Sequence, residues 1–347
     1  MSHQASILAL AAIIGLTAGC DEDPGNPGDV DAPGGGGKAD ELTTGADPEP
    51  PPDDEDAATG SETGEPEGDA QADCPDAAEV FPATWPEGGP ACPEPVLTVH
   101  RYDRDTFILR QSLCTSFEAP FLYMLFGEDA VLVEDTGAGG IPVGDAIEQV
   151  VAFWEEDTQR ATDEPLDIIV VNSHAHGDHV AGNAQLAVRP GFRVVGFGVD
   201  AVSTFLDIDW PHESGEIDLG GRVVEVIPIP GHESSHVALW DHGARLLLTG
   251  DTLYPGRVFV DEFVDLRDSI SKLVEHVADD PPCFVLGTHI EMTREPGVDF
   301  EFGTTHHPNE HALQLSFEHL RELDDALQSM GDAAVFERHD DFIVFPL

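Results

Sequence analysis

The stretch Ser173-His174-Ala175-His176-Gly177-Asp178-His179 places four side chains that can bind a metal within six residues. It directly follows Leu166-Asp167-Ile168-Ile169-Val170-Val171, a mostly apolar stretch that predicts a buried strand. Polar residues just beyond such a strand lie where α/β sheets usually place their active sites. Four polar groups beside a buried strand would be costly without a bound ion. The stretch therefore predicts a metal site.

Three more residues that can bind a metal also follow apolar strands. His232 lies in the tight turn Pro230-Gly231-His232, and Asp251 ends the strand that contains Leu248-Thr249-Gly250. His289 follows Val285-Leu286-Gly287-Thr288 in the same way. Because each candidate lies where a strand passes into a loop, we expect the strand ends to converge on one site.

The order of these residues resembles that of a known family, the metallo-β-lactamase-fold hydrolases. The family pattern is His-x-His-x-Asp-His, then a Gly-His turn, then Asp, then a last His, and all seven positions occur here between His174 and His289. The resemblance implies an α/β fold, a four-layer αββα sandwich of the metallo-β-lactamase type. It covers essentially all of the folded part of the chain.

The resemblance also implies a two-metal centre. His174, His176 and His232 would hold the first metal, and Asp178, His179 and His289 the second. Asp251 would bridge both. These ligands suit two divalent ions, zinc best, with iron or manganese as options. In such a site a metal-bridging hydroxide attacks a carbonyl carbon, and Asp178, as the catalytic residue, carries a proton to the leaving group.

Several other residues are expected around the metals. Asp135 resembles the family's supporting aspartate, and His236 is expected to support the site rather than to bind metal. Tyr254 would either donate to a substrate oxygen or pack beside the pocket. The adjacent His306 and His307 would either border the pocket or cap the following helix. We expect structural or surface roles for four other histidines: His100, His242, His276 and His339.

Within this family, a bridging Asp251 favours an ester, lactone or thioester of a small substrate over a β-lactam. The tail after His289 is short and acidic, which argues against the glutathione thioesters of glyoxalase II. Three alternatives stay open: a single-iron persulfide dioxygenase on the same fold, a β-lactam hydrolase, and a non-catalytic surface-binding lipoprotein. The complete ligand set argues against the first and the last of these.

The charge of the chain limits its partners. It contains 68 acidic and 15 basic side chains, which give a formal net charge of −53 at pH 7. Such a field repels nucleic acid and anionic lipid. We therefore expect a small-molecule substrate and no nucleic acid partner.

The N-terminal part indicates export. The apolar run of residues 5–19 has the length of a signal-peptide core and is short for a membrane span. Leu16-Thr17-Ala18-Gly19-Cys20 resembles the lipobox of bacterial lipoproteins, which implies that residues 1–20 are the signal and that lipidated Cys20 attaches the protein to a membrane, facing the periplasm or the exterior. The alternative is a soluble secreted protein cleaved near Ala18. Residues 21–90 are rich in Asp, Glu, Pro and Gly and predict a disordered linker. The folded domain would then be residues 91–347.

The remaining cysteines are expected to be structural. Cys74, Cys92, Cys114 and Cys283 are an even number in an oxidising compartment. The sequence leaves all three pairings open, and we favour Cys74 with Cys92, which would tie the linker to the domain.

Periodicity predicts alternating strands and helices, as expected for sheets covered by helices. Strands are expected at 106–113, 121–126, 130–133, 166–171, 193–196, 223–227, 237–240, 245–248 and 284–286. Helices are expected at 142–157, from near 180, at 262–277 and at 308–330. A C-terminal hairpin is expected from residues 334–337 and 342–345.

Overall fold

Residues 74–160 and 164–347 are described by a computed structural model of the chain. The predicted signal peptide, lipidated Cys20 and most of the predicted linker lie outside these residues. Among the described residues, no helix combines the length and apolar composition that crossing a membrane requires.

Two large sheets, each of six strands in the described residues, form the centre of the fold. The first sheet runs in chain order, antiparallel up to β4 and parallel from β4 to β6. Its strands are β1 (Leu97–Arg101), β2 (Thr106–Gln111), β3 (Phe121–Phe126), β4 (Ala130–Glu134), β5 (Asp167–Val171) and β6 (Phe192–Val194).

The second sheet is antiparallel except where β10 and β12 run parallel. In spatial order its strands are β13 (Gln314–Leu315), β12 (Phe284–Gly287), β10 (Leu246–Gly250), β9 (Val237–Asp241), β8 (Val223–Pro228) and β7 (Gly215–Asp218). A smaller sheet joins β11 (Arg257–Val260), β15 (Ile343–Pro346) and β14 (Glu337–Arg338).

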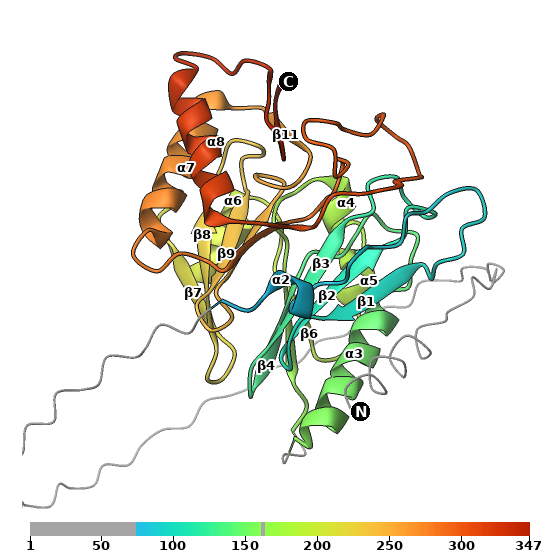
Figure 1. Cartoon of the computed structure of the whole chain (residues 1–347). Coiled ribbons are helices and arrows are strands. Elements are labelled where there is room, and N and C mark those ends of the chain that lie inside the picture. Colours follow the sequence, from blue (N-terminus) through green and yellow to red (C-terminus); the bar gives the residue numbers. More distant parts are fainter. Residues whose placement is uncertain (1–73, 161–163) are drawn as a thin grey trace, which may run out of the picture. The chain divides into compact units, whose positions relative to one another are not determined.

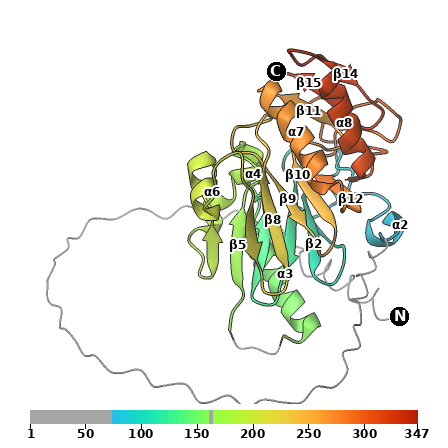
Figure 2. The ribbon, with the colours of Figure 1, turned by 90° about the vertical axis from the view of Figure 1, so that its left-hand side faces the viewer.

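Helices cover the outer faces of both large sheets, with α3 on one side and α7 and α8 on the other (Figure 1). Figure 2 shows the molecule from the side of the second sheet. The helices are α2 (Ala77–Val80), α3 (Val143–Thr158), α4 (Gly177–Val180), α5 (Asn183–Leu186), α6 (Val199–Leu206), α7 (Phe263–Val277) and α8 (Phe317–Ser329). The predicted αββα sandwich is confirmed.

The alternation of side chains along β4 shows why the layers stack this way. Leu132 packs between the two sheets with Leu248 and Leu286, whereas Val131 and Val133 face the helix side with residues of α3. A third apolar cluster lies between the second sheet and α7 and α8. Both faces of the central strands are buried, so these strands are nearly continuous apolar runs.

The folded domain begins earlier than predicted. Residues 74–90, assigned to the linker from their composition, contain α2 and two buried aromatic side chains, Phe81 and Trp85. Phe81 packs edge-on against Phe284, and Trp85 against Phe121. The Pro- and Glu-rich composition hid these apolar anchors.

The favoured disulfide was wrong. The described residues contain the bonds Cys74–Cys283 and Cys92–Cys114. Cys74 lies beside the start of β12 rather than beside Cys92, because the segment with Phe81 packs across Phe284.

The helix predicted at 308–330 was too long. It begins at Phe317, where Ser316 is the N-cap and shares a capping box with His319. The preceding residues are extended, and Leu315 pairs with Val285 of β12. Leu313 and Leu315 are buried at a spacing of two, which suits a strand and not a helix. In the C-terminal hairpin, the first arm is β14 at Glu337–Arg338, later than expected.

Candidate metal centre

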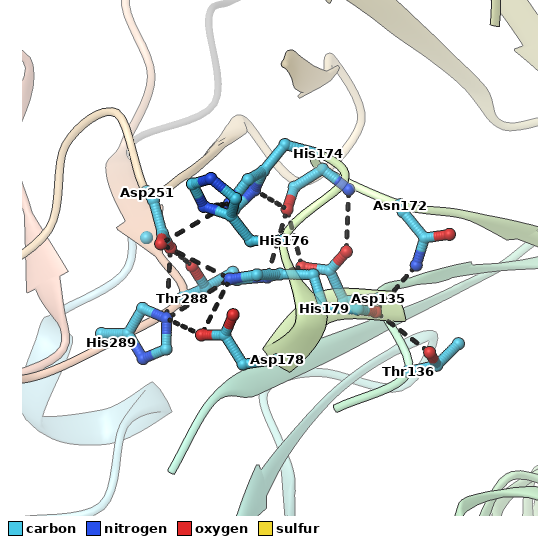
Figure 3. Close-up of polar contacts among 12 residues, drawn as sticks. Asp135, Thr136, Asn172, His174, His176, Asp178, His179, Asp251, Thr288 and His289 are labelled. Carbon is cyan, nitrogen blue, oxygen red and sulfur yellow. Dashed lines mark hydrogen bonds and ion pairs between the residues drawn. The ribbon is translucent and has the colours of Figure 1, made fainter. Parts of the chain in front are cut away.

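The ends of four strands bring the seven predicted ligands together, and Figure 3 labels all of them except His232. Four of them follow β5, with Asp178 and His179 on α4. His232 lies in the connection between β8 and β9, Asp251 follows β10, and His289 follows β12. The seven side chains form two groups that share Asp251, and in each group the potential ligand atoms lie within 4.8 Å of one another.

Two glycines allow the ligand loops to approach their neighbours. Gly231, before His232, has a φ of +142°, and a Cβ there would lie 2.3 Å from Leu266 Cα of α7. Gly250, before Asp251, has a φ of +50°, and its Cβ would lie 2.5 Å from His236 Nε2. Any other residue would push these loops away, so both glycines are needed where they stand.

The first group consists of His174, His176, His232 and Asp251. His176 Nδ1 lies 2.9 Å from His174 Nε2 and 3.1 Å from His232 Nε2. Asp251 Oδ2 lies 3.8 Å from His174 Nε2 and 3.7 Å from His232 Nε2. The facing atoms all belong to groups that coordinate metals.

The second group consists of Asp178, His179, Asp251 and His289. Asp178 Oδ2 lies 3.4 Å from His179 Nε2 and 3.3 Å from His289 Nε2. His179 Nε2 is 3.4 Å from Asp251 Oδ2, and His289 Nε2 is 3.2 Å from Asp251 Oδ1. Asp251 thus reaches both groups through its two oxygens.

Hydrogen bonds on the outer side fix the imidazole rings. The Nδ1–H group of His179 donates to the Asp135 carboxylate at 2.7 Å. The Nδ1–H group of His232 donates to the Phe259 carbonyl at 3.0 Å. The Nδ1–H group of His289 donates to the Glu118 carbonyl at 2.7 Å. Each donation directs Nε2 inward, where this atom can bind a metal once it has lost its proton.

These inward atoms fit divalent ions. His179 Nε2 and His289 Nε2 face each other at 3.4 Å, an approach that requires a proton or a metal ion between the two nitrogens. Two ligands at about 2.1 Å from one tetrahedral zinc lie about 3.4 Å apart, so the spacings of both groups match this donor set. The imidazole and carboxylate mixture suits zinc, iron or manganese.

The field at the site attracts positive charge. Burial lowers the pKa of His174 and His232, which favours neutral rings. Burial acts in the same direction on His179 and His289, but the carboxylates around them, above all Asp251, raise the pKa of both well above the usual value. The pKa values of Asp178 and Asp251 are lowered by these imidazoles despite burial, so both are carboxylates at neutral pH.

Asp135 and His236 lie around the two groups without joining them. Asp135, with a φ of 66°, accepts hydrogen bonds from the Ser173 amide and hydroxyl at 2.8 Å as well as from His179. His236 Nε2 accepts from the Asp251 amide at 3.3 Å, and its Nδ1 faces the Thr252 hydroxyl at 2.5 Å. Both residues hold ligand-bearing segments in place.

Tyr254 packs rather than offering its hydroxyl to a substrate. It is fully buried, its hydroxyl donates to the Arg257 carbonyl and lies 3.2 Å from Glu291 Oε2, and its ring is 5.6 Å from that of His289. Of the two predicted alternatives for Tyr254, the structure fits the second.

The six other histidines considered from the sequence lie apart from the two groups. His307 is buried, stacks on Phe300 at 4.1 Å and pairs with Glu310. His306 is exposed, and neither residue caps α8. The other four make local contacts, with the Val80 carbonyl, Glu225 or Glu322: His100, His242, His276 and His339.

Thr288 and Glu118, which were not among the predicted site residues, both contact ligands. Thr288 Oγ1 donates to Asp251 Oδ1, and its position between β12 and His289 could have suggested it. Glu118, whose carbonyl holds His289, also has its carboxyl near the site: burial raises the pKa of Glu118 to about 7, with His289 opposing and Asp178 adding to the shift. Nothing in the local sequence around Glu118 indicated this contact.

Comparison with known families gives one extended match. The profile of the family described as "Metallo-beta-lactamase superfamily" matches residues 117–332, which contain all seven predicted ligands.

Individual proteins also resemble the chain. The "Hydroxyacylglutathione hydrolase" of Rhodopseudomonas palustris (strain BisB5) is 32% identical over 189 residues, 53% of this chain and 69% of that protein. The protein of the same description from Methylococcus capsulatus is 37% identical over 108 residues, 30% of this chain and 42% of that protein. The chain thus spans less than half the length of some relatives. Among solved structures, the "Metallo-beta-lactamase from Pontibacter korlensis" is 15% identical with a TM-score of 0.45, covering 67% of this chain and 100% of that one.

Proposed function

The chain belongs to the metallo-β-lactamase superfamily, and we propose that it is a metal-dependent hydrolase that uses two divalent metal ions to hydrolyse an ester, lactone or thioester of a small substrate. The observation that carries the proposal is the pair of His/Asp groups joined by Asp251. The related hydroxyacylglutathione hydrolases, which by name act on thioesters, support the choice of bond.

In this proposal each group holds one ion. His174, His176 and His232 bind the first, and Asp178, His179 and His289 bind the second. When bound, the two ions supply a water of lowered pKa and a Lewis acid that polarises the scissile carbonyl. We expect zinc, with iron or manganese as alternatives.

Asp178 is the catalytic residue of the proposal. Its side chain is 20% exposed, whereas those of His174 and His179 are fully buried, so its carboxylate can reach both the metals and a substrate. At neutral pH Asp178 is a carboxylate, which is the form that can accept a proton from the attacking water. It then returns the proton to the leaving oxygen or sulfur, so the products are a carboxylic acid and an alcohol or thiol.

Replacing this carboxylate tests the proposal. We expect Asp178→Ala to abolish hydrolysis of aryl esters, lactones and thioesters by the zinc-loaded protein, because both a metal ligand and the proton carrier are lost. Asp167→Ala is the matched control: it removes one carboxylate from the far, exposed end of β5. Unchanged hydrolysis in Asp178→Ala would refute the role of Asp178.

Metal analysis tests the number and kind of ions independently of turnover. We expect two divalent ions per chain after reconstitution, with zinc giving the tightest binding. One iron per chain, together with oxygen uptake in the presence of a persulfide, would exclude the hydrolase proposal. Preferential turnover of nitrocefin would instead favour a β-lactam hydrolase.

We also propose that the protein acts outside the cytoplasm, attached to a membrane through Cys20. The two disulfide bonds support export, because such bonds persist in oxidising compartments. Radiolabelled palmitate incorporation that is lost in Cys20→Ser would support the attachment, and its absence would favour the soluble secreted form.

A further inference from the structure

We infer that the substrate of this site is an uncharged acyl compound with an apolar group, and that the site selects against anionic substrates such as glutathione thioesters. The inference rests on the proposed function, because it concerns the same site. Two features of the loops beside the second metal group carry it: an exposed aromatic pair and the lack of a free cation.

The aromatic pair lies on two loops that flank His289. Phe117 is in the β2–β3 connection, directly before Glu118, whose carbonyl accepts the His289 Nδ1 hydrogen bond. Phe302 is in the segment that follows His289. The two rings meet at 5.4 Å with an interplanar angle of 66°, although Phe117 is 38% and Phe302 63% exposed.

The position of the pair favours contact with a substrate. Together with Ile290, the residue after His289, the two rings line one small cleft of about 10 Å³, which a substrate could cover but not enter. Exposed apolar patches commonly mark binding sites. An acyl chain or ring of a substrate whose carbonyl is at the metals would cover this surface.

The charged residues of the same cleft are mostly acidic. Glu291 and Glu301 line it, as does Glu118, which is only partly ionised at neutral pH because burial raises its pKa to about 7. Arg257 is the only arginine or lysine of this cleft among the described residues. Arg257 is held by its own partners: its guanidinium lies 3.1 Å from Glu291 Oε1 and 2.6 Å from Asp299 Oδ2, and its side chain is 9% exposed. Arg257 is therefore not free to bind a substrate carboxylate.

The remaining basic group of the cleft is also engaged. His307 Nδ1 lies 3.0 Å from Glu310 Oε1, and its ring stacks on Phe300. A glutathionyl group carries two carboxylates and one ammonium, so it would bring net negative charge to an acidic wall. Like charges that face each other without a counterion act against the wrong substrate. The cleft therefore favours neutral, apolar substrates.

The test compares two thioesters with the same acyl group. The lactoyl thioesters of glutathione and of uncharged N-acetylcysteamine are offered to the zinc-loaded protein at one pH, in low and in high salt. We expect kcat/KM to be about tenfold or more higher for the uncharged thioester, and the gap to narrow in 0.5 M NaCl because salt screens exposed charges. Equal rates, or a preference for glutathione, would overturn the inference while leaving the proposed function intact. Hydrolysis of neither compound, nor of any ester or lactone, would overturn both.

Two substitutions locate the effect. Phe302→Ala should reduce the preference for hexanoyl over acetyl N-acetylcysteamine severalfold, whereas Phe336→Ala, which removes an exposed phenylalanine next to β14, should not. Glu301→Gln should raise kcat/KM for the glutathione thioester alone. Circular dichroism checks that Phe302→Ala folds normally. If it does, an unchanged chain-length preference would contradict the role of the aromatic pair.

Discussion

At the scale of single residues, Thr288 orients the carboxylate of Asp251. Its hydroxyl donates to Oδ1, the oxygen nearer His289. Oδ2 is left facing the Nε2 atoms of three imidazoles at 3.4 to 3.8 Å: His174, His179 and His232. Without the Thr288 hydroxyl, Oδ1 would lose its hydrogen-bond donor and the carboxylate could rotate. The contact between the Asp251 amide and His236 would remain, but it holds the backbone and not the carboxylate.

We predict that Thr288→Val, which keeps the shape but removes the hydroxyl, weakens metal binding by about 10- to 100-fold, as is typical for the loss of a partner that orients a ligand. A competition titration against a chromophoric chelator measures this directly. Thr249→Val is the control, because the Thr249 hydroxyl donates to the Leu253 carbonyl and not to a ligand. Equal affinity in both variants would contradict the orienting role of Thr288.

Glu134 is a second residue with an unusual environment. It is fully buried at the end of β4, and among the described residues neither of its carboxylate oxygens has a hydrogen-bond partner. The alternation of β4 places it on the same face as Leu132, between the sheets. Burial, with a further contribution from Asp135, raises the pKa of Glu134 well above its usual value.

This shift predicts a pH dependence of stability. A carboxyl whose pKa is raised by folding stabilises the native state fully below the unfolded pKa, near 4.5, and this contribution is lost as the pH rises through the folded pKa. In Glu134→Gln the group stays neutral, so the variant should gain up to about 1.4 kcal/mol per pH unit over the wild type above pH 5, until the folded pKa is reached. Urea unfolding of the metal-free proteins between pH 5 and 8 measures the difference.

A control separates this effect from the loss of one negative charge. Glu156→Gln makes the same change at an exposed position on α3. A difference in unfolding free energy between wild type and Glu134→Gln that stays constant from pH 5 to pH 8 would contradict the raised pKa of Glu134.

At the scale of elements, the sequence predicted best where one period held throughout. The central strands are apolar on both faces, so 121–126 and 166–171 were found nearly to the residue as β3 and β5. The helices α3 and α7 each present one apolar stripe and were found equally well. Between 308 and 316 the period changes from that of a strand to that of a helix, and the two were merged into one element.

One strand whose pairing partner is remote in the sequence, β11, was missed. β11 pairs with β15 in parallel, with Val258 opposite Val344. The residues around each strand give no indication that the two strands pair. The Cys74–Cys283 bond has the same character, since the two cysteines are 209 residues apart. Local patterns cannot choose between pairings that depend on how the layers are stacked.

The candidate site divides in the same way. The seven side chains of the two metal groups could be selected because each lies in a short motif after a strand. The groups that hold them could not, because they come from other elements: the Glu118 carbonyl from the β2–β3 loop and the Phe259 carbonyl from β11. A contact made by a backbone carbonyl does not depend on the residue type, so the sequence cannot predict it.

At the scale of the whole domain, long-range links fasten the N-terminal segment and the loop after His289 to the sandwich. Arg110 of β2 forms a buried bidentate pair with Glu310 at 2.7 Å, and its guanidinium lies 4.9 Å from the Phe121 ring. The Cys74–Cys283 bond joins the start of the described domain to β12. Through these links, residues distant in sequence stabilise the strand that leads to Thr288 and His289.

The two disulfide bonds should differ in what they contribute. In the chain-entropy account, a bond stabilises by restricting the unfolded chain, and the effect grows with the logarithm of the loop it closes. The loops have sequence separations of 209 and 22 residues. We therefore predict that the double replacement Cys74→Ser/Cys283→Ser lowers the free energy of unfolding by about 2 kcal/mol more than Cys92→Ser/Cys114→Ser does. Urea unfolding of the metal-free variants at one pH measures both.

Metal binding gives the second measurement on the same variants. The Cys92–Cys114 bond lies in the segment that leads to Phe117 and Glu118, and the Glu118 carbonyl fixes His289. Its loss should therefore loosen the loop and weaken metal binding more than the loss of Cys74–Cys283, although it costs less global stability. If the same bond dominates both stability and metal affinity, the two effects share one origin, and the separation between a bond that ties the domain together and a bond that shapes the site is wrong.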